Sequence, residues 1–377
     1  MNNKKTLSQI YLFPFRAMGF LVPQSRSTKR TTATMLWRAG LMALLLGSGG
    51  VMGLPTWANS VPTLPTTQVP ATQKIIYVNP TLGTDSSSLV NSEETPYRTL
   101  TYALQQAQAG TTIQLANGSY SRESGEKFPL IINSGVILRG NESTKGRNVS
   151  IVGGGSYLSR TFASQNTTIL AQKDSEIRGV TITNPNTRGT GVWIESSNPT
   201  VENNTFVNSW REGIFVTGTA APKIVNNVFT QNKANGISVA RAAQGEIRGN
   251  LFQDTGFGIA ISETAAPFVI DNLVIQNKDG IVISHSAHPV LRQNLIERNT
   301  RYGLVAITDA QPDLGTANDP GNNIIHNNGQ YDLYNVTNSE TLRTIGNEIA
   351  SSGRGKVSLP VASPAIEPLQ SAEPNDI

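Results

Sequence analysis

From about residue 166 the chain repeats an apolar pattern every 22 or 23 residues. Each repeat opens with a glycine, and the first and third residues after it are apolar. That alternation is typical of a strand with one buried face. The glycines are Gly191, Gly213, Gly236, Gly258, Gly280 and Gly303. Six glycines in register indicate a structural repeat rather than chance.

Two further apolar runs follow in each repeat. The second places an apolar residue two positions after a proline or glycine: Val201, Ile224, Ile247, Val269, Leu291 and Leu314. The third places one two positions after an asparagine: Phe206, Phe229, Phe252, Val274 and Ile296. Three short strands with three turns account for about 22 residues, and such a coil buries its interior only by stacking on its neighbours. The pattern predicts an all-β chain, folded as a right-handed, single-stranded parallel β-helix with three short strands per coil.

Asparagines recur with the same period between the second and third runs: Asn204, Asn227, Asn250, Asn272 and Asn294. A tight turn at this point leaves polar groups facing inward. Stacked amides satisfy one another along the axis, because each amide has both donors and an acceptor. We therefore expect a structural asparagine ladder, which starts at Asn204 because Val180 takes this position one coil earlier. The three phenylalanines of the third run predict an interior aromatic stack.

Residues 75–165 lack the regular repeat and are expected to form an N-terminal cap and the first coils. A helix is predicted over 100–109, with Leu100, Ala103, Leu104 and Ala107 on one face. It is placed to cover the N-terminal strand edges, which would otherwise invite aggregation. Strands are predicted at 75–78, 111–115, 129–132, 135–139 and 148–152, and the regular repeats extend over 166–350.

The two ends of the chain differ in composition from this body. Residues 1–58 carry basic residues, an apolar run at 39–54 and small residues before a cut after Ala58, which together predict a signal peptide. The run is shorter than the roughly 20 residues of a membrane span, so none is expected in the mature chain, although a retained anchor remains the alternative. Residues 59–74 read as a Pro/Thr-rich linker and 351–377 as a disordered tail rich in Pro, Ser and Ala. The protein is therefore expected in the periplasm, the cell envelope or the extracellular space.

The charge of the chain is unevenly distributed. Residues 1–58 hold seven basic residues and no acid, so the remainder has 23 basic and 26 acidic residues, a net charge of −3. The sequence therefore gives no reason to expect nucleic acid as a partner. The chain contains no cysteine, which excludes disulfides.

The GIxI and P-x-I-x-x-N-x-F coils resemble the parallel β-helix repeat of the pectate-lyase-like superfamily. The segments YVNPTLGTDS, PYRTLTYALQQAQAGTTIQLANGSY and FPLIINSGVILRGN resemble the N-terminal block of a secreted bacterial β-helix family known as a domain of unknown function. The resemblance covers roughly residues 75–350. It implies the fold but not an activity, because the superfamily contains lyases, hydrolases, epimerases and non-catalytic members.

The same resemblance implies that catalysis would use carboxylates clustered on the outer face of the first strand and its turns. The outward strand positions supply one carboxylate, Glu195, and no histidine. Turn carboxylates remain available at Glu212, Asp254, Glu263 and Asp279. The sequence thus favours a non-catalytic protein that requires no cofactor, with a polysaccharide lyase, hydrolase or epimerase as the alternative.

The same outer face suggests a carbohydrate-binding patch. Trp193 and Phe215 are expected to point outward on neighbouring coils, with Glu195 beside them. Aromatic rings next to charged groups can hold a sugar, whose apolar face stacks while its hydroxyls bond. The turn leading into the second coil adds Trp210, Arg211 and Glu212. We expect the protein to bind or organise a cell-envelope or extracellular polysaccharide. A protein-interaction scaffold is a further alternative, as is cover of these rings by the linker, the tail or a second subunit.

One coil carries an insertion. Pro312 and Asn323 are 11 residues apart, where other coils have a spacing of five. Four oxygen-bearing side chains crowd in or next to the insertion: Asp309, Asp313, Asn318 and Asp319. Such a glycine-bearing loop is typical of a Ca²⁺ site, and its composition is equally typical of an ordinary tight turn.

Overall fold

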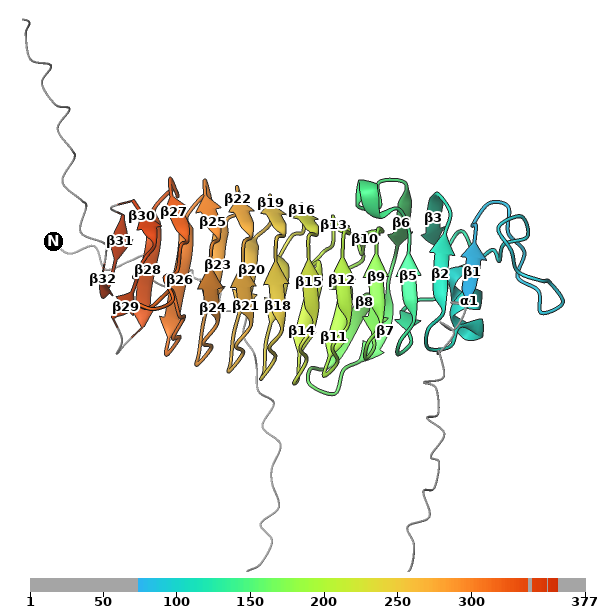
Figure 1. Cartoon of the computed structure of the whole chain (residues 1–377), viewed down its shortest axis with the longest axis horizontal. Coiled ribbons are helices and arrows are strands. Elements are labelled where there is room, and N and C mark those ends of the chain that lie inside the picture. The colour runs from blue at the N-terminus through green and yellow to red at the C-terminus, as the bar shows by residue number, and fades with distance from the viewer. Residues whose placement is uncertain (1–73, 338–340, 351, 359–377) are drawn as a thin grey trace, which may run out of the picture. The chain divides into compact units, whose positions relative to one another are not determined.

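The computed structural model describes residues 74–337, 341–350 and 352–358. The predicted signal peptide lies outside these residues, as does the predicted linker except for Lys74. The described chain winds into stacked coils, each adding one rung to three parallel sheets (Figure 1). This confirms the right-handed parallel β-helix predicted from the repeat.

Within each of the three sheets, successive rungs come from successive coils. Sheet A consists of β1 (Ile75–Val78), β2 (Thr112–Leu115), β5 (Ile137–Arg139), β9 (Glu176–Arg178), β12 (Thr200–Glu202), β15 (Lys223–Val225), β18 (Glu246–Arg248), β21 (Phe268–Ile270) and β24 (Val290–Arg292). Sheet B consists of β3 (Gly118–Ser121), β6 (Val149–Val152), β10 (Thr181–Thr183), β13 (Thr205–Val207), β16 (Val228–Thr230), β19 (Leu251–Gln253), β22 (Leu273–Ile275), β25 (Leu295–Glu297), β27 (Ile324–His326) and β30 (Glu348–Ile349).

Sheet C holds the strands that follow the repeat glycines. They are β4 (Leu130–Ile132), β8 (Ser164–Ala171), β11 (Gly189–Glu195), β14 (Ile214–Thr217), β17 (Asn235–Val239), β20 (Phe257–Ile261), β23 (Asp279–Ile283), β26 (Tyr302–Thr308), β28 (Tyr331–Thr337) and β31 (Gly353–Arg354). A further strand, β7 (Gly155–Leu158), pairs with β8 in the antiparallel sense. Two short strands, β29 (Leu342–Arg343) and β32 (Val357–Ser358), pair with each other outside the three sheets.

The interior is filled by the columns that the repeat predicts. Val192 pairs with Ile214, and Ile214 pairs with Ile237, so like residues stack from coil to coil, and each of the three is fully buried. Phe206, Phe229 and Phe252 form the expected aromatic stack, with ring centroids 4.8 Å apart and planes within 7°. The core is therefore continuous along the coil axis.

The ladder asparagines lie at the inner side of the turn between sheets A and B. In Asn227 the side-chain Nδ2 donates to Asn250 Oδ1 at 3.0 Å and to the Val201 carbonyl at 2.9 Å, and its backbone N–H donates to the same Asn250 oxygen at 2.9 Å. The same arrangement continues through Asn323 to Asn347, beyond the insertion. These bonds satisfy polar groups that lie inside the coil.

A second ladder, which sequence reasoning missed, lies between the third and first strands. Asn277 Nδ2 donates to Asn299 Oδ1 at 3.1 Å, and Asn299 Nδ2 donates to Asn328 Oδ1 at 2.9 Å. Asn232 and Thr255 hold the same position in earlier coils, bonded in the same direction. The regular spacing of these residues was visible in the sequence. The second asparagine column was not recognised, because serine and threonine take the place of asparagine in some coils.

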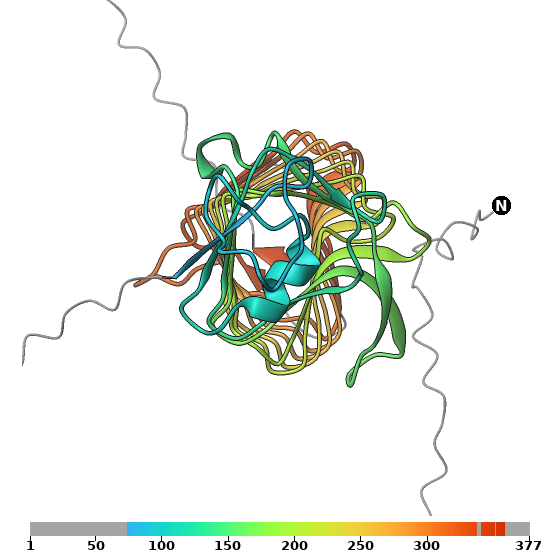
Figure 2. The same ribbon diagram turned by 90° about the vertical axis from the view of Figure 1, so that its right-hand side faces the viewer.

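The N-terminal end is covered by α1 (Leu100–Gln106), which crosses the mouth of the coil in Figure 2. The helix is shorter than the predicted 100–109, because Ala107 already has extended backbone angles. Thr99 caps it, and the Glu126 carboxylate accepts the backbone N–H groups of Leu100 and Thr101 at 2.7 and 2.8 Å. A short 3₁₀ helix, η1 (Glu142–Thr144), follows β5.

At the C-terminal end the structured part extends past residue 351, where the tail was expected to begin, because β31 and β32 lie beyond it. In the part of the chain that the structure describes, no helix has the length and apolar character needed to cross a membrane.

Candidate functional site

Trp193 and Phe215 point away from the coil interior, as the alternation requires, but they are covered and do not form an open binding surface. Trp193 is 1% exposed and Phe215 is 5% exposed. Their rings stack with centroids 4.4 Å apart and planes within 5°. The hairpin formed by β7, β8 and the loop between them lies over the pair, on the outside of the coil in Figure 2. Phe162 in that loop contacts both rings edge-on, at centroid distances of 6.2 and 5.2 Å.

Glu195 holds this hairpin in place. One carboxylate oxygen accepts the Tyr157 hydroxyl at 2.7 Å. The other accepts the Ser159 hydroxyl at 2.9 Å and the Thr161 N–H at 2.6 Å. Burial works to raise the pKa of Glu195, but these hydrogen bonds favour the charged form and leave its pKa below the ordinary value. Burial and the neighbouring carboxylate raise the pKa of Tyr157 to about 12.

The other residues of the predicted patch also interact with neighbouring side chains. Arg211 donates to Glu212 at 2.9 Å and to Gln165 of β8 at 3.3 Å. Glu212 is 2% exposed and accepts the Thr190 hydroxyl. Trp210 is 41% exposed, and the Lys233 ammonium lies 3.8 Å from its ring centroid. The six predicted residues therefore do not form one exposed patch, and only Trp210 presents an open ring.

A different group of aromatic rings lies open on the same sheet. Tyr302 of β26 and Tyr331 and Tyr334 of β28 form what we call the tyrosine cluster. Tyr302 and Tyr331 are parallel within 2° at 6.2 Å, and Tyr334 lies 5.1 and 5.6 Å from them. All three rings are partly exposed on the outer face of sheet C.

Two arginines border the tyrosine cluster. The Arg354 guanidinium lies 5.5 Å from the Tyr331 ring and 5.7 Å from the Tyr334 ring, and it donates to the Tyr331 hydroxyl at 3.0 Å. Arg301 lies 5.4 Å from the Tyr302 ring and pairs with the buried Asp279. Burial raises the pKa of Tyr302, so its hydroxyl keeps its proton at neutral pH.

Sequence reasoning missed the tyrosine cluster because the insertion separates Tyr302 from Tyr331 and Tyr334. Tyr331 pairs in register with Tyr302, and Tyr334 pairs with Val305. The coil of Tyr331 lacks the column glycine, so the repeat recognised in the sequence ended at Gly303. The available signal was a Tyr-x-x-Tyr strand one coil after Tyr302.

The turn carboxylates of the enzymatic alternative are separated from one another. Glu212 and Asp279 occupy the same column of sheet C, with Asn235 and Phe257 between them. Three rungs of about 4.8 Å place them roughly 14 Å apart. Paired catalytic carboxylates of glycosidases lie about 5–9.5 Å apart. Glu263 pairs with Arg241, and Asp254 is exposed on another turn.

The insertion at 312–323 carries an ion-pair network centred on Arg292. Its guanidinium Nη2 donates to Asp313 at 2.9 Å and to Asp319 at 2.7 Å. Burial works to raise the pKa of Asp313, but the bonds from Arg292 and Gly315 bring it below its ordinary value. Asp309 and Asn318 are exposed. Across the described ranges, no group of three or more His, Asp or Glu residues could hold a metal ion, and the calcium site stays a prediction.

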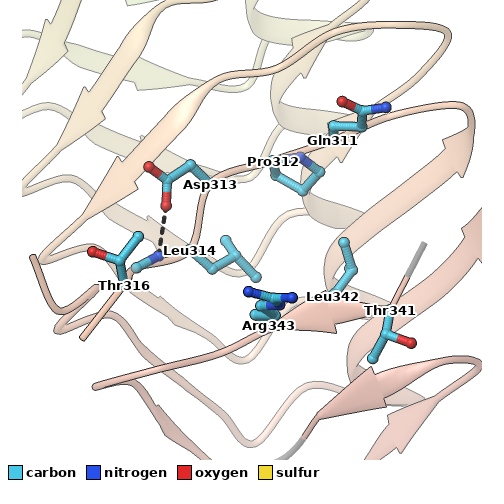
Figure 3. A pocket seen from close by; sticks show the side chains of 9 residues that line it. Gln311, Pro312, Asp313, Leu314, Thr316, Thr341, Leu342 and Arg343 are labelled. Atoms are coloured by element: carbon cyan, nitrogen blue, oxygen red, sulfur yellow. Dashed lines mark hydrogen bonds between the residues drawn. The ribbon is translucent and has the colours of Figure 1, made fainter. Parts of the chain in front are cut away.

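Beside this network is a cavity of about 350 Å³ (Figure 3). One wall is the segment 311–316, which takes the sheet A position of its coil. The opposite wall is 341–343, and Figure 3 shows Arg343 lying across from Asp313 and Leu314.

This architecture defines a parallel β-helix with one hairpin-covered face and one open aromatic cluster. The chain belongs to the family described as "Protein of unknown function (DUF1565)", whose model matches residues 81–352. This match confirms the resemblance of the N-terminal block and the coils to such a family. No curated protein matches the chain.

Among solved structures the chain is similar to pectate lyase Pel9A, with 12% identity, 76% of this chain and 79% of that chain covered, and a TM-score of 0.49. It is similar to XylC in complex with xylose, with 11% identity, 73% and 72% covered, and a TM-score of 0.46. It is also similar to the periplasmic alginate epimerase AlgG, with 16% identity, 66% and 74% covered, and a TM-score of 0.39. At these identities and TM-scores the similarities carry no argument about activity.

Proposed function

We propose that the protein binds a polysaccharide, without catalysis, through the tyrosine cluster on the outer face of sheet C. The observation that carries this proposal is the arrangement of three partly exposed tyrosine rings from two neighbouring strands, bordered by Arg301 and Arg354. Aromatic faces stack on the apolar face of a sugar ring, while phenol and guanidinium groups bond its hydroxyls.

The outer face next to the tyrosine cluster suits an extended ligand. Toward the N-terminus the same column of sheet C continues with Val282, Ala260 and Ser238. Their side chains are short and project little from the outer face, so this strip of the sheet is free of large side chains as far as the Phe215 rung. The hairpin then rises over Phe215 and ends this strip. A chain of sugars can therefore lie along the strip with its end stacked on the tyrosines.

The acids nearest the tyrosine cluster support binding rather than catalysis. Asp279 is 2% exposed and paired with Arg301. Asp332 is also 2% exposed and accepts from Asn328 and the Ser352 hydroxyl. A general acid or base must reach the substrate proton directly or through one water, and neither carboxylate is open to do so.

Affinity electrophoresis through gels containing a panel of neutral and acidic polysaccharides tests the proposal. The wild-type protein should be retarded by at least one polysaccharide. Tyr334→Ala should weaken retention about tenfold, because one stacking contact of about 1.4 kcal/mol corresponds to a factor of ten. Phe268→Ala is the matched control, since it removes an aromatic ring that is 52% exposed on sheet A.

Retention that is lost in Tyr334→Ala and kept in Phe268→Ala supports the proposal. Equal retention of both variants, at unchanged unfolding midpoints, would overturn it. Product release from the retarding polysaccharide, measured as reducing ends or unsaturated uronates, would overturn the non-catalytic part alone.

A further inference from the structure

The outer face of sheet B carries an unbroken row of aliphatic side chains, which we call the aliphatic column. Its members pair in register on successive strands and are Val228, Leu251, Leu273, Leu295 and Ile324. All five side chains are partly exposed, and Ile324 is 36% exposed. At about 4.8 Å per rung the column is roughly 19 Å long. A continuous apolar surface of this kind is typical of a site of protein association.

The outer face of sheet A differs from this column. Its outward positions carry charges in most coils, and these charges form ion pairs along the sheet, as between Arg178 and both Glu176 and Glu202, and between Arg248 and Glu246. Aliphatic side chains gain nothing comparable from their neighbours along a sheet. They are removed from water only when another apolar surface packs against them.

The two ends of the aliphatic column carry opposite charges. Three rungs before Leu273 the loop that contains η1 lies over the column, where the Thr205 hydroxyl donates to the Lys145 carbonyl at 2.9 Å. The Lys145 ammonium donates to the Asn226 side-chain oxygen at 2.8 Å and has no carboxylate partner among the described residues. Three rungs after Leu273 the column ends at Glu348, which is exposed and likewise forms no ion pair within the described ranges.

We propose that the aliphatic column is the interface of a two-fold dimer, in which it packs against sheet B of a second copy of this chain. The two-fold axis runs along the strand of Leu273, in the plane of the interface, so the two coil axes are antiparallel. Each rung then faces the rung at the same distance on the other side of Leu273. Leu251 of one copy faces Leu295 of the other, and Val228 faces Ile324.

The charges at the ends of the column fit this symmetry. Lys145 lies over the column three rungs before the axis and Glu348 lies in it three rungs after the axis, so the two residues meet between copies. The symmetry forms this ion pair twice, once at each end of the interface. A second copy is therefore complementary to the column in both charge and apolar character.

The η1 loop also has room in this arrangement. Sheets packed face to face lie about 10 Å apart, which accommodates a loop segment on Thr205 opposite the Glu348 side chain. Glu348 belongs to β30, the last described strand of sheet B. The inference is independent of polysaccharide binding, because the interface lies on sheet B and the tyrosine cluster on sheet C.

Sedimentation equilibrium of the mature chain tests the dimer. The wild-type protein should be in a concentration-dependent equilibrium between monomer and dimer. Leu273→Asp, which places two carboxylates on the axis, should raise the Kd of the dimer roughly tenfold or more. Phe268→Asp adds the same charge on the outer face of sheet A and should leave the Kd unchanged.

Two results of this experiment contradict the proposal. One is a wild-type protein that stays monomeric up to about 100 µM, since a specific dimer has a Kd well below this value. The other is a dimer that survives Leu273→Asp and is lost in Phe268→Asp, which places the interface on sheet A.

Single cysteines test the symmetry without adding charge, because the chain contains no cysteine of its own. Leu273→Cys lies on the axis, so a short bis-maleimide should join two copies. Ile324→Cys should not be joined to itself, because its two copies lie four rungs, about 19 Å, apart along the coil. It should be joined to Val228→Cys when the two variants are mixed. Absence of the Leu273→Cys product, or joining of Ile324→Cys to itself alone, contradicts the two-fold.

A charge exchange tests the pairing at the ends of the interface. Glu348→Lys should raise the Kd of the dimer roughly tenfold, because like charges then meet at both ends. Adding Lys145→Glu to this variant should restore the wild-type Kd. A double variant that dimerises no better than Glu348→Lys would show that these residues do not meet, and the antiparallel arrangement is then wrong.

Discussion

At the scale of single residues, buried and half-buried polar side chains join neighbouring parts of this protein through hydrogen bonds. Glu195 accepts three hydrogen bonds from the hairpin, and each ladder asparagine joins two coils. Leaving such a group without its partner costs about 1–3 kcal/mol. Two variants measure these contributions.

Glu195→Gln should lower the free energy of unfolding by about 1–2 kcal/mol at pH 7, because charge-assisted bonds to the hairpin become neutral ones. The pKa of Glu195 is lowered in the folded state, so its contribution is full above the ordinary value of 4.5 and is lost as pH falls through the lowered pKa. Urea unfolding at pH 7 and pH 3 should show the difference from wild type shrink at pH 3. Asp254→Asn, which changes an exposed acid, should show no difference at either pH. A constant difference for Glu195→Gln would contradict the assignment.

Asn250→Ala should cost about 1–3 kcal/mol for each polar group left unsatisfied, because Asn227 loses its acceptor and Asn272 loses a donor to its side-chain oxygen. Denaturant melts measure the loss. The matched control is Asn148→Ala, which removes an exposed asparagine side chain that has no hydrogen-bond partner among the described residues and should change stability by less than about 0.5 kcal/mol. Equal melts for both variants would mean that the ladder bonds contribute nothing.

At the scale of elements, the β7–β8 hairpin decides which part of sheet C is open. It turns Trp193 and Phe215 from an expected binding surface into a small second core with Tyr157, Phe162 and Leu170. The strands beyond the Phe215 rung have no such cover, so the aromatic surface available to a ligand moves to the tyrosine cluster.

Trp193→Ala should therefore destabilise the protein by about 3–5 kcal/mol, the usual cost of truncating a buried aromatic ring. Limited proteolysis should cut sooner within 158–164, since the hairpin loses its main contact. Polysaccharide retention should be unchanged under conditions where the variant is folded. Trp193→Phe is the control: it keeps the ring contact and removes an indole N–H that has no hydrogen-bond partner among the described residues, so it should cost much less. Wild-type stability of Trp193→Ala would mean that the hairpin does not cover the ring.

At the scale of the whole molecule, a stack of coils has two ends at which strand edges are exposed. The N-terminal end is closed by α1 and the carboxylate that caps it. The C-terminal end has its last rungs in sheets B and C but an open position in sheet A.

Export belongs to the same scale and depends on residues outside the described structure. The basic, apolar and small-residue segments before Asn59 predict cleavage after Ala58. Mass spectrometry of the mature protein should find its N-terminus near Asn59, in a periplasmic or extracellular fraction. An intact leader on protein recovered from the cytosol would contradict the prediction.

The sequence by itself determined the coil. Because interior side chains must alternate along each strand and like residues must stack, the glycine, proline and asparagine columns specify register, strand count and the buried set, down to the Phe206 stack. Local periodicity carries this information, since the paired strands of the repeat join residues one period apart.

Only the tertiary structure decided which outward residues reach solvent. The parity of the strand placed Trp193 and Phe215 outside correctly. No period links them to the β7–β8 hairpin, whose strands pair antiparallel and whose Phe162 lies 31 residues before Trp193 and 53 before Phe215. In the same way, the tyrosine cluster and the Arg292 network bring together residues separated by an insertion that shifts the register. The exposure of a side chain depends on which segments pack over it. In this chain the segments that cover outward residues lie outside the regular repeat, so the repeat pattern does not predict them.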